Sequence, residues 1–286
     1  MTGPPAARPA FPPPRLRRAR HRLRSRVFTS PLYLPYARLR FSRDPSPAVV
    51  GARTELVIDG YFRSANTFAV YAFQLGQDRP VRLAHHLHAP AQLLAAARRG
   101  LPALLLIREP RDAILSELLY DRGVTIRGAL AAYHQFYVCL LPSIDRFVVG
   151  EFGQVTTDLG GVTRQLNERF GTRFAEVTPT AAGRRECFEL MRQRGTLSPV
   201  LLGFESGLVS RDELRAQLPA IARQPRPAHL REAWVPSGHR ARLTAALAQD
   251  WLAPDLAQPR EQAEHVYQEV LAAAACHTGA HARAGG

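Results

Sequence analysis

The sequence predicts an α/β fold in which a parallel β-sheet is flanked by helices. Short apolar runs near residues 55–59, 80–84, 103–107 and 146–150 alternate with segments of helical periodicity, and this alternation is typical of parallel strands joined by helical crossovers. Polar or basic side chains lie within a few residues of the ends of the first three runs. Because ligands of such sheets bind at the carboxyl ends of the strands, we expect the functional site at this edge.

The first run continues into a turn that is suited to binding an anion. Residues 56–58 (LVI) are strand-like, the turn 59–68 (DGYFRSANTF) follows, and residues 69–75 belong to an amphipathic stretch. The first turn of a helix has unpaired N–H groups and a partial positive charge, so it stabilises a phosphate or sulfate. The turn lacks the Gly-Lys-Ser/Thr sequence of a nucleoside triphosphatase loop, which indicates an anion bound without a metal ion.

The third run also ends in groups that bind phosphate. Residues 104–107 (LLLI) are continuously apolar, as expected of a buried parallel strand. Arg108 follows, and Pro110 fits the first turn of the next helix, where its missing N–H is not needed. Ser116 then lies about two turns into that helix. Arg108 and Ser116 are candidates for binding one phosphate together. The structural alternatives are an ion pair with a neighbouring acid for Arg108, and a hydroxyl bonded to the preceding turn of the helix for Ser116.

Three histidines follow the second run. His85, His86 and His88 invite a metal interpretation, but a zinc site needs three or four ligands, and neither a cysteine nor a third ligand at a fixed spacing lies nearby. We therefore expect no metal ion. A base at the end of a strand, beside the anion site, fits better, with His86 as the first candidate and the other two as alternatives.

Helices are expected to cover the sheet in the rest of the chain. Residues 129–141 are predicted to form a helix whose aromatic and leucine side chains belong to the core, and further helices are expected at 211–223, 238–250 and 260–275. Glu151 follows the fourth run, where capping of the next element is its expected role.

The chain is expected to consist of a tail and one folded domain. Residues 1–50 are rich in proline and carry eleven arginines against one acid, a charge of +10 out of the total of +14. Such a segment buries too little apolar surface to become ordered, so we expect a disordered tail at 1–50 and an α/β domain with a helical C-terminal part at 51–286. We expect a solvated tail, with an anionic membrane surface as the alternative partner; nucleic acid is not expected to bind.

Cysteine usage and hydropathy indicate the compartment. Cys139, Cys187 and Cys276 are far apart and include no C-x-x-C pair, which argues against a disulfide framework and for a reducing environment. No apolar run approaches the length of a membrane span, and we therefore expect a cytoplasmic protein. The sequence predicts no particular oligomeric state. All 38 basic residues counted as lysine or arginine are arginine. The presence of arginine instead of lysine at any one position is therefore weak evidence of a binding role.

Taken together, these segments resemble the sulfotransferase family that uses 3′-phosphoadenosine-5′-phosphosulfate (PAPS). The family's phosphosulfate loop has the pattern Y-P-K/R-S-G-N/T-T-W, and residues 61–68 read YFRSANTF. Its second signature, R-N/D-P-K/R-D-x-x-x-S, is similar to residues 108–116, which read REPRDAILS. Between them the cytosolic branch carries K-T-H-L-P, and residues 84–88 (AHHLH) place His86 at the histidine position.

The resemblance implies a fold, a reaction and a set of site residues. The fold would be the three-layer sulfotransferase fold related to P-loop NTPases, and the reaction would transfer a sulfuryl group from PAPS to a hydroxyl or amine, releasing 3′,5′-diphosphoadenosine (PAP). Arg63 and His86 would act in catalysis. The cofactor would be bound at the 5′-phosphosulfate by Arg63, Ser64, Ala65, Asn66 and Thr67, and at the 3′-phosphate by Arg108 and Ser116. A late family segment, R-K-G-x-x-G-x-W, is faintly similar to residues 230–235, which adds Arg231 as a candidate for the 3′-phosphate.

Departures from the family patterns leave other functions open. Ala65 replaces the loop glycine, Glu109 replaces a neutral or shorter residue, and Ala84 replaces the lysine of K-T-H. A phosphotransferase related to nucleotide kinases is one alternative, although it would be expected to use magnesium and a loop lysine. A nucleotide-binding protein without catalytic activity is the other. The acceptor, whether a small molecule, a glycan or a lipid, is not specified by the sequence.

Overall fold

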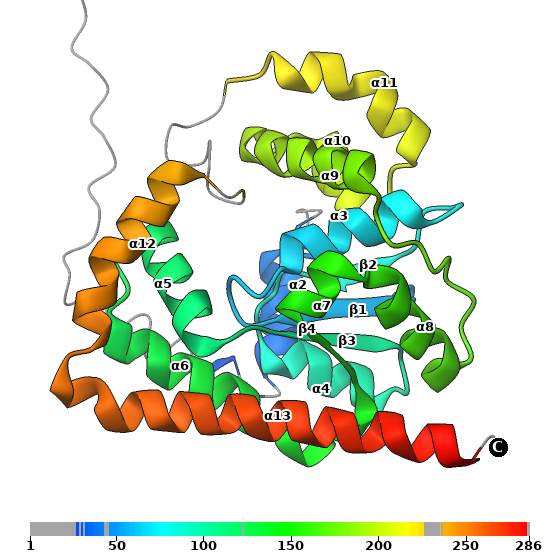
Figure 1. Cartoon of the computed structure of the whole chain (residues 1–286). Coiled ribbons are helices and arrows are strands. Elements are labelled where there is room, and N and C mark those ends of the chain that lie inside the picture. Colours follow the sequence, from blue (N-terminus) through cyan, green and yellow to red (C-terminus); the bar gives the residue numbers. More distant parts are fainter. Residues whose placement is uncertain are drawn as a thin grey trace, which may run out of the picture.

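Four parallel strands form the central sheet (Figure 1). They are β1 (Leu56–Gly60), β2 (Leu83–His85), β3 (Ala103–Ile107) and β4 (Val148–Glu151), in the spatial order β2-β1-β3-β4. In the middle of the sheet, Ile58 of β1 lies beside His85 of β2 and Leu104 of β3. The predicted α/β class with a parallel sheet is confirmed.

The computed structural model describes residues 27–28, 30, 32–42, 46–121, 123–225, 235 and 237–284. The helices are α2 (Tyr33–Arg40), α3 (Asn66–Gly76), α4 (Pro90–Arg98), α5 (Pro110–Tyr120), α6 (Ile126–Val138), α7 (Phe152–Thr157), α8 (Leu159–Phe170), α9 (Ala181–Gln193), α10 (Pro199–Glu205), α11 (Arg211–Ala222), α12 (Gly238–Trp251) and α13 (Ala257–Ala284), with the short 3-10 helices η1 (Leu141–Arg146), η2 (Arg194–Thr196) and η4 (Pro254–Leu256). The four helices expected from periodicity correspond to α6, α11, α12 and α13. Within the described residues, no helix has both the length and the apolar character needed to span a membrane.

Helices cover both faces of the sheet, which makes a three-layer structure (Figure 1). Because successive side chains of a strand point to opposite faces, Val57 and Leu105 belong to one core cluster, whereas Ile58 and Leu104 belong to the other. The first cluster is closed by α2, α4, α5, α6 and α13, and the second by α3 and the helices from α7 to α11. The sheet thus has an apolar core on each side.

The strand order creates a switch point between β1 and β3. From β1 the chain passes through α3 to β2, whereas from β3 it passes through α5 and α6 to β4, on the opposite side of β1. Ligands of open parallel sheets bind where the connections of two neighbouring strands diverge in this way. Arg63 follows β1 and Arg108 follows β3, so both predicted anion-binding segments begin at this point.

The end of β1 and the loop after it need unusual backbone conformations. A Cβ atom at Gly60 would lie 2.2 Å from the carbonyl oxygen of Leu106, so only glycine allows β1 and β3 to approach this closely. Arg63 and Ala65 have φ values of +66° and +67°, a left-handed conformation that costs residues other than glycine about 1–2 kcal/mol each. The loop before α3 is therefore strained, a condition that is common at functional sites.

The predicted disordered tail extends too far along the chain. Within the segment 1–50, α2 packs Tyr33 and Leu34 into the first core cluster, and Val50 is fully buried. The physical reason is that the sequence around α2 supplies apolar side chains on one helix face, despite the prolines and arginines nearby. Residues 1–26 lie outside the described part of the chain, so disorder there stays a prediction.

Replacing Ala65 with glycine is expected to stabilise the protein, because the loop then adopts its left-handed conformation without strain. The gain of about 1–2 kcal/mol exceeds the cost of greater freedom in the unfolded chain, about 0.4–1 kcal/mol. Ala69→Gly is the matched control, since the same change inside α3 should destabilise by about 1 kcal/mol. Urea unfolding of the two variants checks this, and a destabilised A65G protein would contradict it.

Candidate active site

The loop between β1 and α3 presents a helix start without a side-chain cap. Asn66 begins α3, and its N-cap residue is Ala65, which makes no side-chain hydrogen bond to the helix. Asn66 Nδ2 donates to the carbonyl oxygen of Tyr61 at 2.9 Å, which closes the loop, while its buried Oδ1 has no hydrogen-bond partner within the described residues. A helix start of this kind can take an anion in place of a cap.

Not all predicted loop residues face the same side. Ser64 is fully buried, and its hydroxyl lies 3.5 Å from the hydroxyl of Tyr137 behind the loop. Thr67, in contrast, contacts His86, with 3.1 Å between Oγ1 and Nε2. The loop therefore brings the predicted base next to the start of α3, whereas the Ser64 side chain points into the core.

Arg63 connects the first predicted motif with the second. Its Nε donates to Ser116 Oγ of α5 at 3.0 Å, across 53 positions of sequence. Ser116 therefore does not simply bond to the preceding turn, the structural alternative considered for it. Tyr120, one turn further along α5, lies with its ring centroid 5.8 Å from the Arg63 guanidinium carbon.

Arg240 is a member of the site that sequence reasoning missed. It lies in the first turn of α12, and its Nη2 donates to the same Ser116 Oγ at 3.1 Å. No local pattern distinguishes it from the other arginines; only the packing of α12 beside α5 brings it here (Figure 1). Arg231, the candidate from the late segment, lies outside the described residues.

Arg108 lies next to these groups at the end of β3. Its Nη1 donates to the carbonyl oxygen of Arg63 at 3.3 Å, and its guanidinium carbon lies 4.0 Å from the ring centroid of Phe152. It also forms the ion pair with Asp112 that was considered as an alternative, with 3.1 Å between Nη2 and Oδ2. However, Arg108 Nε is buried without a partner among the described residues, so the ion pair does not satisfy the whole guanidinium group.

Arg63, Arg108, Arg240 and Ser116, named here the arginine cluster, have an excess of positive charge. Burial, and then the charges of Arg240 and Arg108, lower the pKa of the Arg63 guanidinium to about 9, while the buried carboxylate of Glu117 acts in the opposite direction. The carboxylate of Asp112 is half-exposed and contacts Arg108 from its own helix, so solvent screens its charge. A multiply charged anion bound among these groups would relieve their mutual repulsion.

The three histidines after β2 have different surroundings. His88 Nδ1 bonds to the Gly60 carbonyl oxygen at 2.9 Å, and its ring lies 4.3 Å from that of Phe62. His85 is fully buried. His86 contacts the first turn of α3, through Thr67.

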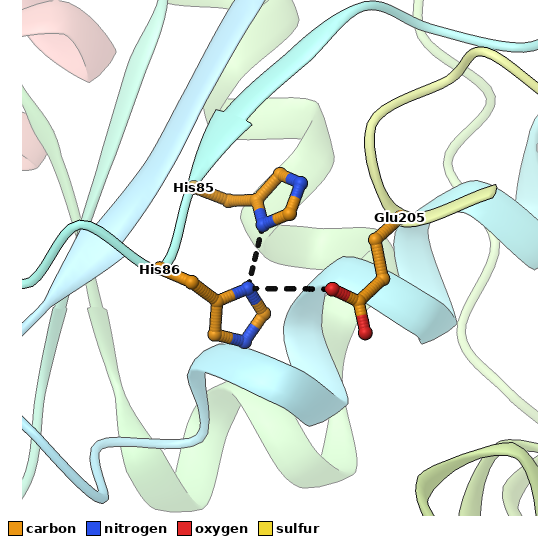
Figure 2. Close-up of side chains that lie close together, drawn as sticks. All are labelled: His85, His86 and Glu205. Atoms are coloured by element: carbon orange, nitrogen blue, oxygen red, sulfur yellow. Dashed lines mark hydrogen bonds and ion pairs between the residues drawn. The ribbon is translucent and has the colours of Figure 1, made fainter. Parts of the chain in front are cut away.

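His85, His86 and Glu205 form a buried cluster (Figure 2). The two histidine Nδ1 atoms lie 2.6 Å apart, and His86 Nδ1 lies 3.8 Å from Glu205 Oε2. Burial lowers the pKa of His85 to about 4 and that of His86 well below its usual range, so both rings are neutral at neutral pH. Glu205 is also held by Tyr71 at 2.7 Å and by Arg194, whose Nε lies 2.6 Å from Oε1.

The same three side chains could in principle hold a metal ion, since their ligand atoms lie within 4.8 Å of one another. Zinc bonds of about 2.0–2.1 Å at tetrahedral angles place two ligating nitrogens roughly 3.3 Å apart, whereas the Nδ1 atoms here are 2.6 Å apart. The Arg194 guanidinium against Glu205 also opposes a second cation. The geometry therefore favours a hydrogen-bonded cluster over a metal centre.

Asp59 at the end of β1 ties the two halves of the site together. Its carboxylate accepts hydrogen bonds from the backbone N–H of Gly60 and His88 and from Gln92 Nε2. Burial raises the pKa of Asp59 to about 7, against these hydrogen bonds, which favour the charged form. It therefore acts as a buried brace that joins β1, the histidine segment and α4.

Glu109 and Glu151 have structural roles. Glu109 is the N-cap of α5 and accepts from the N–H of Arg111 and Asp112, and Pro110 occupies the first helical turn as predicted. Glu151 accepts from the N–H groups at the start of α7, which confirms its predicted capping role. Neither carboxylate points to a part in binding.

Comparison with known proteins yields no relatives. No family model, no curated protein and no solved structure matches this chain. The resemblance to sulfotransferases thus rests on the sequence patterns alone.

The buried neutral state of His85 predicts how stability depends on pH. The pKa of His85 is about 4 in the folded protein and 6.5 in a free chain. Between these pH values His85 is therefore protonated in the unfolded chain and neutral in the folded protein. The free energy of unfolding should therefore decrease as the pH is lowered from 6.5 to 4. This residue should contribute about 1.4 kcal/mol per pH unit and about 3 kcal/mol in total.

Subtracting the unfolding free energy of His85→Asn from that of the unmodified protein isolates this contribution from that of Asp59, which has the opposite sign. Urea unfolding of both proteins at several pH values between 7 and 4 measures it. We expect the difference to shrink as the pH falls; a constant difference would show that His85 is not held neutral.

Proposed function

We propose that the protein is a sulfotransferase that transfers a sulfuryl group from PAPS to a hydroxyl or amine. The observation that carries the proposal is the double contact on Ser116, whose Oγ accepts from both Arg63 and Arg240. Arg63 belongs to the first sequence signature and Ser116 to the second, and Arg108 contacts the backbone of Arg63. The arginine cluster would bind one phosphate, and the loop before α3 would bind a second anion. Two neighbouring anion sites fit a nucleotide with phosphate at both its 3′ and 5′ positions.

Each group has a role in this proposal. Arg108, Arg240 and Ser116 would bind the 3′-phosphate, while Asn66, Thr67 and the start of α3 would bind the 5′-phosphosulfate. Arg63 lies between the two positions, since its backbone belongs to the loop and its side chain contacts Ser116. Ser64, given its buried side chain, would contribute through its backbone, and so would Ala65.

The chemistry would be an in-line displacement at sulfur. His86 Nε2 would take the proton of the acceptor while the acceptor's oxygen or nitrogen bonds to sulfur and the bond from sulfur to the bridging oxygen breaks. Arg63 and the N–H groups of α3 would stabilise the negative charge that develops on the leaving phosphate, an effect of roughly 10²–10³ in rate for each well-placed donor. The base would add about 10²–10⁴, and PAP would be released.

Two alternative functions, a phosphotransferase and an inactive binding protein, would require different features of the site. A kinase-like phosphotransferase would need magnesium and a phosphate-binding lysine, and the chain contains no lysine. A binding protein without activity would keep the arginine cluster but would not turn over, as Ala84 in place of the family lysine suggests. The acceptor, a small molecule, a glycan or a lipid, and the cytoplasmic location both stay predictions.

Titration with PAP in the absence of magnesium tests the binding half of the proposal. Each charge-assisted hydrogen bond contributes about 1.5–3 kcal/mol, so Arg108→Ala and Arg240→Ala should each weaken binding about 10- to 100-fold. Arg98→Ala is the matched control, because this exposed arginine ends α4 at the opposite edge of the sheet. Equal binding by all three variants, or binding that requires magnesium, would overturn the proposal.

Turnover tests the catalytic half. With sulfur-labelled PAPS and a panel of acceptors, Arg63→Ala should reduce sulfuryl transfer by about 10²–10³-fold, whereas Arg98→Ala should leave it unchanged. Labelled product from the unmodified protein identifies the acceptor. Transfer by R63A at the unmodified rate would remove Arg63 from the mechanism, and PAP binding without any transfer would favour the inactive binding protein.

A further inference from the structure

A chain of hydrogen bonds runs from α10 through both histidines to the anion-binding loop. Ser206 Oγ donates to the carbonyl oxygen of Leu202 at 3.3 Å and lies 3.1 Å from His85 Nε2. His85 Nδ1 lies 2.6 Å from His86 Nδ1, and His86 Nε2 lies 3.1 Å from Thr67 Oγ1. Both nitrogens of both rings are therefore engaged, and the proton positions are interdependent.

The direction of the chain follows from its first member. We assign the Ser206 hydroxyl proton to the Leu202 carbonyl oxygen, which can only accept. The Ser206 oxygen then accepts from His85, which places the proton of the neutral His85 on Nε2. His85 Nδ1 is then an acceptor, so His86 must carry its own proton on Nδ1. His86 Nε2 is left with its lone pair, directed at the hydroxyl of Thr67.

We propose that His85 is a positioning residue that fixes His86 as the Nδ1–H tautomer, so that the basic Nε2 faces the site of sulfuryl transfer. The part about the tautomer stands on the hydrogen bonds alone, whereas the part about catalysis rests on the proposed function. His85 thus does for His86 what the third member of a catalytic triad does for its histidine. No metal ion and no further proton acceptor is needed.

The groups around the pair act on the protonation of His86 in opposite directions. Glu205 of α10 lies 3.8 Å from His86 Nδ1, on the side where the imidazolium would share its charge. Burial opposes the ionised form of Glu205, but Arg194 of η2, His85 and Tyr71 of α3 hold its pKa below its usual range. Burial, and then Arg194, His85 and His88, oppose the protonation of His86, so His86 stays neutral until the acceptor's proton is transferred.

The backbone holds His86 in the required orientation. Its φ is +57°, an uncommon value for a residue other than glycine, although histidine tolerates it better than most. Residues kept in such conformations are found where the surrounding structure fixes them. His85 in β2, which also pairs with Ala48, supplies the rigid neighbour.

Nitrogen NMR of the unmodified protein tests the tautomer directly and needs no activity. Histidine ring nitrogens with and without a proton have well-separated ¹⁵N shifts, and the signals of His86 are identified by their loss in His86→Asn. At pH 7 we expect a protonated Nδ1 and an unprotonated Nε2 for His86, and the reverse for His85. A proton on His86 Nε2 would overturn the proposal, whether or not the protein transfers sulfuryl groups.

A pair of nearly isosteric variants tests the cause. The amide oxygen of His85→Asn can accept from His86 Nδ1–H, whereas His85→Leu cannot, so the tautomer should persist in H85N and be lost in H85L. If an acceptor has been found, H85L should lower kcat on the order of 10²-fold, within the range of a general base, with the KM for PAPS unchanged, while H85N stays within a few-fold of the unmodified protein. Equal losses in H85N and H85L would mean that His85 only fills space.

Discussion

Repulsion among three guanidinium groups is the constraint on which the candidate site depends. Arg63 comes from the loop after β1, Arg108 from the end of β3 and Arg240 from α12, and two of them share one serine hydroxyl. All three residues are half-buried, and gathering charges of one sign away from water costs free energy unless a counter-charge is present. The partial charge at the start of α3 adds to the same field. A ligand with several negative charges would relieve this repulsion, which is the physical basis of the proposed function.

The fold could be predicted from the sequence where local patterns were strong. The apolar runs of β1 and β3 are short and continuous, as expected of buried parallel strands, and the core face of α6 has helical periodicity. The prediction was wrong at α2, because composition argued for a tail while the packing of a few apolar side chains decided the outcome. Such burial depends on a partner surface that becomes visible only in three dimensions.

The site was predictable to the extent that it follows strands. Residues at the ends of neighbouring parallel strands meet by geometry, which is why the segments that contain Arg63 and Arg108 could be placed at one site from sequence. The contact between Arg63 and Ser116 was not predicted. Arg240 and Glu205 could not be predicted, since Arg240 lies more than 100 positions from Ser116, and Glu205 more than 100 positions from Tyr71. Arg240 is also one arginine among 38. The same holds for the link between His85 and His86, whose ring orientations depend on Ser206 and Thr67.

The most direct measurement compares the affinities for PAP and for adenosine 5′-phosphate, which differ only by the 3′-phosphate. If the arginine cluster binds that group, calorimetry should show PAP binding at least about 100-fold more tightly, because two or more charge-assisted hydrogen bonds are lost without it. The preference should shrink in Arg240→Ala and persist in Arg98→Ala. Equal affinity for the two nucleotides in the unmodified protein would contradict the central claim.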